Sequence, residues 1–270
     1  MQIIERGQGS ERTILFFPCT AEPVWAFAET IERLSQSWHV FQVIFDRHQP
    51  EYPGDFSSVE QTVDEVTAYL KAHGGTRLDA AYGCSLGGAC LTRLLALGEV
   101  PVGRAIIDGG ITPYQLPYAV RRLLLARDVL SFQIVANSRK ILEAAFPPER
   151  FTLPGHDPVQ EYDAMEAYLK TYSTRTIRNV FWSGNNYILP QTPASNGTSI
   201  AYWYGADEKK DRKSNIRFIQ SYFPQIQLHE FPNMAHGELV IVHPEEFCRY
   251  ADEFLTGQTD AAARQEQETL

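Results

Sequence analysis

The stretch Ala80–Leu97, AAYGCSLGGACLTRLLAL, decides the fold that we predict for this chain. It starts in a short apolar run, turns within Gly83–Gly87 (GCSLG), and continues into a segment with leucines on one helical face, at Leu91, Leu94 and Leu95. The glycines that flank Ser85 permit a very tight strand-to-helix turn because they remove side chains that would collide there. We therefore expect Ser85 at the tip of such a turn, clear of the backbone.

A serine in this position is suited to nucleophilic chemistry. The helix that begins there offers free N–H groups and the positive end of its dipole, so the Leu86 amide is a candidate donor to a developing oxyanion. The main structural alternative is a dinucleotide-binding loop, G-x-G-x-x-G, which requires glycine where Ser85 stands. The pattern therefore favours acyl transfer over dinucleotide binding.

Short apolar runs and segments of helical period alternate on both sides of this turn. The apolar runs are Ile14–Phe17, Val40–Phe45, Leu78–Tyr82, Ala105–Ile107, Ile200–Tyr204 and Ile226–Phe231. The helical segments are Trp25–Leu34, Val59–Leu70, Ala89–Leu97, Ile216–Phe223 and Phe247–Leu255. Continuous apolar runs are typical of strands covered on both faces, so the alternation predicts an α/β fold with a mostly parallel, doubly wound sheet flanked by helices.

The alternation stops between residues 111 and 196, where only helical patterns are found. At 270 residues the chain is long enough for one large α/β domain with an insertion. We therefore expect an α/β core formed by residues 1–110 and 197–256, interrupted by a helical cap at 111–196. Residues 257–270 have lost nearly all large apolar side chains, which predicts a mobile C-terminal tail.

A serine nucleophile needs a base, and the base needs an acid that orients it. His236 follows a strand-like run and is the candidate base, and Asp207 follows another such run and is the candidate acid. Asp207 has the alternative interpretation of a helix-entry aspartate. The remaining options are Glu208 and Asp108 for the acid, and His229 and His243, which are better explained as structural residues, for the base.

Together these segments resemble capped, single-domain proteins of the α/β-hydrolase fold, from about residue 10 to 256. The resemblance is carried by GCSLGG at 83–88, AYWYGADEK at 201–209, NMAH at 233–236 and HPEEFCRYADEFL at 243–255. The order Ser85, Asp207, His236 is the order of the triad in that fold. The resemblance implies that the cap lies between the sixth and seventh strands.

The same resemblance implies a second oxyanion donor in the loop after Ile14–Phe17. Because Pro18 has no N–H, we expect the Thr20 amide to serve, with the Cys19 amide as the alternative. Cys19 and Cys84 are interpreted as small packing residues. Substrate contacts are predicted from Trp25 and Tyr114, within a wider set of aromatic candidates: Tyr118, Phe132, Tyr162, Tyr168, Trp182 and Tyr187.

The expected function is that of a serine hydrolase that cleaves a carboxylic ester or related acyl bond of a small apolar or aromatic substrate. Within the same fold the alternatives are carbon–carbon bond hydrolysis, cofactor-free peroxide chemistry and a non-catalytic ligand-binding role. Haloalkane dehalogenation and epoxide opening are disfavoured because those enzymes have Asp where this chain has Ser85. We expect no cofactor, and no zinc site, because His229-Glu230 does not begin an H-E-x-x-H helix.

The composition of the chain disfavours some classes of binding partner. The chain has 24 Lys and Arg against 33 Asp and Glu, a net charge of -9, which disfavours nucleic acid and anionic membrane surfaces. Its four cysteines form no C-x-x-C pair, and charged residues interrupt the N-terminal segment where an export signal needs an apolar stretch. We therefore predict a cytoplasmic monomer or homodimer, without membrane insertion, that acts on a small molecule.

Overall fold

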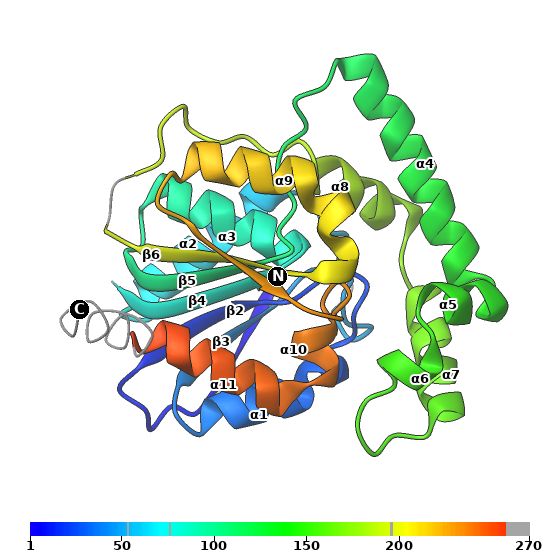
Figure 1. Ribbon diagram of the computed structural model, residues 1–270, viewed down its shortest axis with the longest axis horizontal. Coiled ribbons are helices and arrows are strands. Elements are labelled where there is room, and N and C mark those ends of the chain that lie inside the picture. The colour runs from blue at the N-terminus through cyan, green and yellow to red at the C-terminus, as the bar shows by residue number, and fades with distance from the viewer. Residues whose placement is uncertain (53, 76, 195–196, 258–270) are drawn as a thin grey trace.

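A central sheet of seven strands organises the computed structural model, which describes residues 1–52, 54–75, 77–194 and 197–257 (Figure 1). The strands are β1 (Gln2–Arg6), β2 (Thr13–Phe17), β3 (His39–Ile44), β4 (Leu78–Cys84), β5 (Val102–Asp108), β6 (Ser199–Gly205) and β7 (Gln227–Phe231). Their order is β1-β3-β2-β4-β5-β6-β7, and only β1 pairs antiparallel to its neighbour. The predicted fold class, a mostly parallel sheet flanked by helices, is confirmed.

Strand β1 is the one strand that the apolar runs did not predict. It pairs with β3 at the edge of the sheet, with Ile3 opposite Val43, and its side chains are half-buried or exposed. Only Ile3 and Ile4 of its sequence, QIIER, are apolar, so it lacks the continuous apolar run of the buried strands.

Helices cover both faces of the sheet (Figure 1). One face carries α1 (Ala28–Ser35), which follows the short turn η1 (Val24–Phe27), and α11 (Pro244–Leu255); the other carries α2 (Val59–Ala72), α3 (Leu86–Leu97) and α9 (Lys209–Tyr222). Successive residues of β2 alternate between the two cores: Leu15 and Phe17 join the core with α2 and α3, and Ile14 and Phe16 join the core with α1 and α11. This alternation explains why the strands read as continuous apolar runs.

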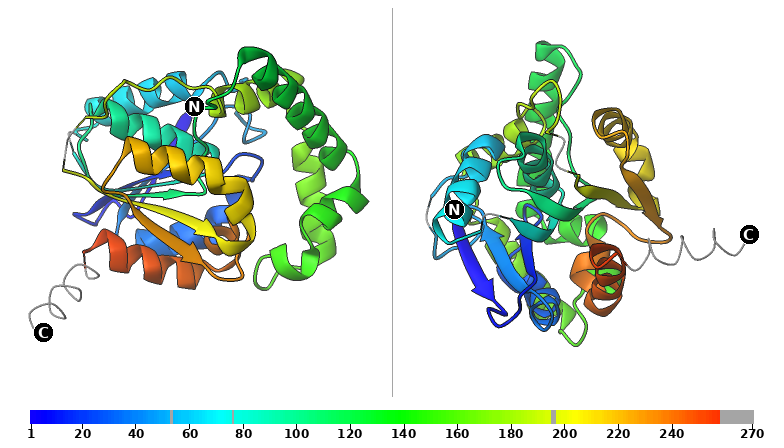
Figure 2. Two further views of the ribbon diagram at one scale, coloured as in Figure 1. Left: turned by 45° about the horizontal axis from the view of Figure 1, so that its top comes forward. Right: turned by 90° about the vertical axis from the view of Figure 1, so that its left-hand side faces the viewer.

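The insertion consists of α4 (Tyr118–Ala136), α5 (Arg139–Ala145), α6 (Pro148–Phe151), α7 (Pro158–Leu169) and α8 (Thr174–Gly184). It lies between β5 and β6, the fifth and sixth strands of the described part of the chain, where the resemblance had implied the sixth and seventh. Figure 2 shows α4–α7 standing beside the body of the molecule, at the end of the sheet where the parallel strands finish. Residues of the insertion line the same cavity as Ser85 and His236.

The cap has a core of its own, and it is joined to the body by packing of α8 and by hydrogen bonds from α7. Leu142, Ile177 and several tyrosines form a separate buried cluster, whereas Val180 of α8 belongs to the main core. The Tyr168 hydroxyl lies within hydrogen-bond distance of the backbone oxygens of Glu22 (3.0 Å) and His48 (3.1 Å). The loop after β2 is thereby tied to α7.

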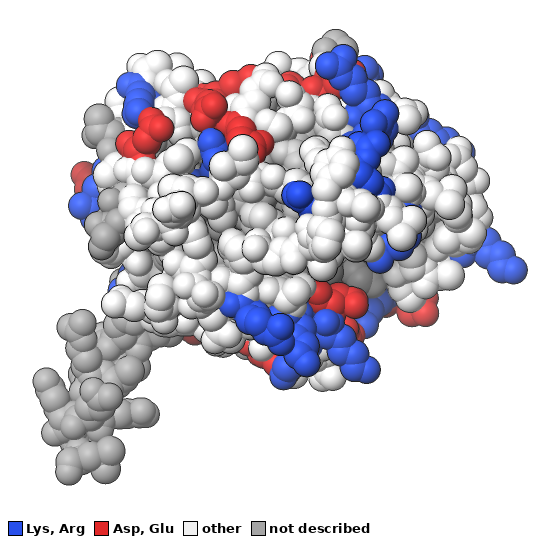
Figure 3. All heavy atoms as spheres, turned by 90° about the horizontal axis from the view of Figure 1, so that it is seen from above, with Lys and Arg blue, Asp and Glu red and all other residues white. Residues whose placement is uncertain are grey.

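Among the described helices, none combines the length and the apolar character that crossing a membrane requires. On the face seen in Figure 3, acidic and basic side chains are interspersed with wide uncharged areas, so the acidic excess does not form one continuous patch there. The predicted mobile tail at 257–270 lies, except for Gly257, outside the described residues.

Candidate active site

Ser85 occupies the turn between β4 and α3. Its backbone has φ 55° and ψ −112°, a conformation that residues other than glycine rarely adopt. The turn is held because the Ser85 N–H donates to the Asp108 carbonyl at 2.9 Å and the Ile111 N–H donates to the Ser85 carbonyl at 3.2 Å. Backbone strain of this kind is typical of functional sites, and here it directs the side chain into a cavity under the cap.

The two glycines of GCSLG are required by close backbone contacts. A Cβ on Gly83 would lie 2.4 Å from the Gly87 carbonyl oxygen, and a Cβ on Gly87 would lie 2.5 Å from the carbonyl oxygens of Phe17 and Pro18. The start of α3 is therefore pressed against the loop that follows β2. This contact brings the Leu86 amide close to the segment that contains Cys19 and Thr20, whose oxyanion roles stay predictions.

His236 lies in the loop between β7 and α10 (Glu238–Val242), and its carboxylate partner is Glu208. Nδ1 of His236 is 2.7 Å from Oε2 of Glu208, whose side chain is 7% exposed. Burial by itself would raise the pKa of Glu208, but the neighbouring His236 and Arg212 lower that pKa to about 2. The carboxylate therefore remains ionised wherever the histidine titrates.

The structure does not bring Asp207 to His236. The Asp207 carboxylate pairs with Nη1 of Arg150 at 2.8 Å, and its side chain is 49% exposed. The reason is local: β6 ends at Gly205 and a short 3₁₀ turn, η2 (Ala206–Glu208), follows, in which consecutive side chains point in directions about 120° apart. The expected position of the acid is therefore occupied by its neighbour, Glu208, which the sequence had left as an alternative.

Asp108, the other alternative acid, is engaged elsewhere. The Tyr82 hydroxyl donates to its Oδ2 at 2.6 Å, and burial raises the pKa of Asp108 to about 7. The two histidines considered as alternative bases lie apart from His236 and Glu208. His229 packs among Trp203, Phe231 and Tyr250, and His243 precedes α11.

Arg212, on α9, is a residue of the site that the sequence reasoning missed. Its Nε is 2.6 Å from Oε2 of Glu208, and its Nη2 is 3.3 Å and 3.4 Å from the two ring nitrogens of His236. These near-equal distances place the guanidinium over the imidazole ring. The pKa of His236 is lowered by burial and further by Arg212, against the opposing effect of Glu208. The i,i+4 spacing of Glu208 and Arg212 was the signal available in the sequence.

Glycines make room for the histidine loop. Gly109 has φ +52°, and a Cβ there would lie 2.6 Å from Cε1 and Nδ1 of His236. A Cβ on Gly205 would lie 2.1 Å from the carbonyl oxygen of Met234. The ends of β5 and β6 therefore approach the loop as closely as backbone allows.

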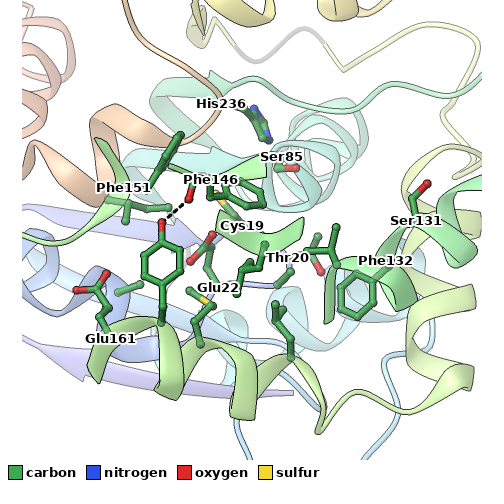
Figure 4. Close-up of a pocket in the computed structure, with 18 of the residues that line it drawn as sticks. Cys19, Thr20, Glu22, Ser85, Ser131, Phe132, Phe146, Phe151, Glu161 and His236 are labelled. Atoms are coloured by element: carbon green, nitrogen blue, oxygen red, sulfur yellow. Dashed lines mark hydrogen bonds between the residues drawn. The ribbon is translucent and has the colours of Figure 1, made fainter. Parts of the chain in front are cut away.

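Ser85 and His236 line one cavity of about 340 Å³, together with Cys19 and Thr20 (Figure 4). No hydrogen bond joins the Ser85 hydroxyl to His236 among the described contacts, and such bonds are often long until a substrate binds. Burial raises the pKa of both the Cys19 and the Cys84 thiol, which favours the packing role expected for them.

The cavity wall is mainly apolar. Of the predicted aromatic contacts, Trp25, Phe132 and Tyr162 line it. The others do not: Tyr114, Tyr118, Tyr168, Trp182 and Tyr187. Sequence reasoning missed other lining residues, which include Phe146, Phe151, Phe181, Met165, Glu22 and Glu161. Arg121 donates to Asn186 and Arg122 lies over the Trp182 ring, and neither lines the cavity.

No protein-family model matches the sequence, and no curated protein matches it either. Solved structures do resemble it. An α/β hydrolase family protein from Desulfitobacterium hafniense aligns with a TM-score of 0.70 at 15% identity, covering 94% of this chain and 100% of that one. MenH from S. aureus aligns at 0.68 and 13%, covering 96% and 98%, and the enol-lactonase from Burkholderia xenovorans LB400 at 0.65 and 15%, covering 94% and 95%. At these identities the likeness concerns the fold.

Proposed function

Because the chain has the α/β-hydrolase fold, we propose that it is a serine hydrolase that cleaves a carboxylic ester or related acyl bond. The observation that carries the proposal is the pairing of His236, which lines the same cavity as Ser85, with the buried carboxylate of Glu208. A nucleophile, a base and an orienting carboxylate are the three groups that such chemistry needs. Solved structures of similar fold include esterases and lactonases, which agrees with this reaction class.

In the proposed reaction the substrate carbonyl lies in the cavity beside Ser85. Nε2 of His236 takes the Ser85 proton while the serine oxygen bonds to the carbonyl carbon. Glu208 accepts the hydrogen bond from Nδ1–H and stabilises the imidazolium that forms. The oxyanion receives hydrogen bonds from the Leu86 amide and from the Thr20 or Cys19 amide.

The acyl-enzyme then forms as the carbon–oxygen bond to the leaving alcohol breaks and His236 returns the proton to that alcohol. Water enters, His236 removes its proton, and attack on the ester of Ser85 releases the carboxylic acid and restores the serine. No cofactor takes part in these steps.

The lining of the cavity supports a small substrate with an apolar or aromatic acyl group. Phe132, Phe146 and Phe181 contribute apolar surface, and a volume of about 340 Å³ is at the lower end of ligand pockets. A cytoplasmic location and a monomeric or homodimeric state stay predictions.

A fluorophosphonate probe tests the proposal. We expect one phosphonate on the wild-type chain, located by peptide mapping at Ser85, and none on Ser85→Ala. Turnover of a phenyl ester panel should fall by roughly 10³-fold or more in that variant. Folded wild-type protein that is neither labelled nor active on any ester would contradict the proposal and favour the ligand-binding alternative. Carbon–carbon hydrolysis and peroxide chemistry are tested by adding a diketone and a peroxide assay to the same panel.

A further inference from the structure

Glu22 is a polar group of the cavity that the proposed mechanism does not use. We propose that Glu22 binds a protonated amine carried by the acyl group of the substrate, so that the substrate is a cationic ester. The inference rests on the proposed function, because it names the substrate class of the same site.

The backbone at Glu22 is held in a fixed position. Ala21, just before it, has φ 62°, which is rare for a residue with a side chain, and its N–H donates to the Tyr172 hydroxyl at 3.2 Å. The Tyr168 hydroxyl donates to the Glu22 carbonyl at 3.0 Å. The cap therefore fixes the segment that directs the Glu22 side chain into the cavity, as Figure 4 shows.

The Glu22 carboxyl differs from the other carboxyls of the cavity in having no partner. Glu161 accepts from the Leu153 N–H at 3.1 Å and lies 2.9 Å from Nδ1 of His156. Asp128 pairs with Nη2 of Arg127 at 2.6 Å. No described residue forms a hydrogen bond or an ion pair with the Glu22 carboxyl. An unpaired carboxyl against an apolar wall is costly, and a bound cation would satisfy it.

The remaining lining favours a cation over an anion. Among the described residues that line the cavity there is no Lys or Arg, whereas Glu22, Glu161 and Asp128 all contribute carboxyls. Phe132, Phe146, Phe151, Phe181, Trp25 and Tyr162 add aromatic rings, whose faces attract ammonium groups. A substrate with a carboxylate in its acyl group would meet repulsion at the same place.

Cation binding at Glu22 is also expected to depend on pH. Burial, and then the charge of Glu161, raises the pKa of Glu22 to about 8, so the Glu22 carboxyl is largely protonated at neutral pH. A cation binds the ionised form, so its binding releases a proton and strengthens as the pH rises toward that pKa. The neighbouring Tyr162, Tyr168, Tyr172 and Cys19 have pKa values raised by burial, and Glu161 is paired with His156. Glu22 is therefore the group expected to titrate there above about pH 7.

The experiment compares matched phenyl esters. In each pair one acyl chain ends in a dimethylamino group and the other in an isopropyl group of the same shape, with spacers of three to seven methylenes. The values of kcat/KM are measured for wild type, Glu22→Gln and the control Glu29→Gln, which removes an exposed carboxyl of α1 that pairs with Arg33. We expect wild type and Glu29→Gln to prefer the cationic ester by roughly 10-fold or more at the best spacer, and Glu22→Gln to lose this preference.

Two outcomes overturn the inference: equal or weaker turnover of the cationic ester at every spacer, and a cationic preference that persists in folded Glu22→Gln. Circular dichroism and thermal unfolding establish that the variant is folded. If it is not, the ratio of kcat/KM for the two esters of wild type decides, because His236 affects both esters alike. A ratio that rises between pH 7 and 9 supports the inference, and a flat ratio overturns it. In all these cases turnover of the neutral ester through Ser85 shows that the proposed function itself stands.

Discussion

Nδ1 of His236 lies 2.7 Å from Oε2 of Glu208, and Glu208 is almost completely buried. The adjacent carboxylate, Asp207, instead faces outward to Arg150. Two adjacent residues therefore have different roles: Glu208 is the buried partner of the candidate base, and Asp207 belongs to a surface ion pair. This distinction can be measured with a pair of isosteric variants.

The Glu208→Gln variant is expected to lose most of its ester turnover. An amide cannot stabilise the imidazolium and favours the wrong tautomer of His236, so we expect kcat to fall by roughly 10²- to 10⁴-fold. Asp207→Asn is the matched control, and because it breaks only a half-exposed ion pair we expect less than about a 3-fold change. Steady-state kinetics on one phenyl ester measure both, and circular dichroism confirms folding. The reverse ranking would make Asp207 the acid.

Replacement of Arg212 by Met is expected to move the acidic limb of the kcat/KM profile to higher pH. The guanidinium disfavours the protonated imidazole and so lowers the pKa of His236, which acts as a base only when neutral. Without that cation the pKa rises and activity at low pH is lost. Arg212→Lys keeps a positive charge and should retain more of the low-pH activity. Identical profiles for Arg212→Met and wild type would show that Arg212 does not tune the base.

Gly109→Ala is expected to displace the imidazole. The new Cβ would lie 2.6 Å from the His236 ring, so we expect kcat to fall by about 10-fold or more. Gly155→Ala, in the cap, is the control: its φ is +80°, but a Cβ there meets nothing within 4 Å. Both variants should be destabilised by about 1–2 kcal/mol because of their positive φ, whereas only Gly109→Ala should lose activity. Equal activity of the two would contradict the close contact with His236.

The cysteines are expected to be unreactive in the folded protein. Burial raises the pKa of Cys19, Cys84 and Cys90, and raises that of Cys248 to about 12. Alkylation by iodoacetamide at about pH 8 should therefore be at least ~10-fold slower than in urea-denatured chain, and ester turnover should survive the treatment. Rapid loss of activity together with modification of Cys19 or Cys84 would assign a thiol to the site.

The fold was predictable because its strongest signals are local. Strands buried on both faces read as continuous apolar runs, and the helices between them carry a 3.6-residue period. The alternation on either side of residues 111–196 was therefore visible without any contact information. Strand β1 was missed because its sequence, QIIER, has only two apolar residues and it owes its place to pairing with β3. Such pairing is a long-range property that a local pattern does not encode.

The candidate site was predictable in part for the same reason. Ser85 stands in a turn whose first glycine, Gly83, is required by a contact with Gly87 four residues away, and His236 follows a strand-like run. The roles of Arg212 and Glu22 were not visible. Arg212 becomes part of the site only because α9 packs beside the histidine loop, and Glu22 only because the cap encloses it.

The sequence by itself determined the alternation of strands and helices, the strained turn at Ser85 and the presence of a histidine and two carboxylates near the ends of late strands. Only the tertiary structure decided that Glu208, and not Asp207, meets His236, and that Glu22 faces the cavity without a partner. The physical reason is the direction in which each side chain points. In the 3₁₀ turn after β6, each residue rotates the side chain by about 120°, and which direction leads inward depends on where the distant loops and the cap lie.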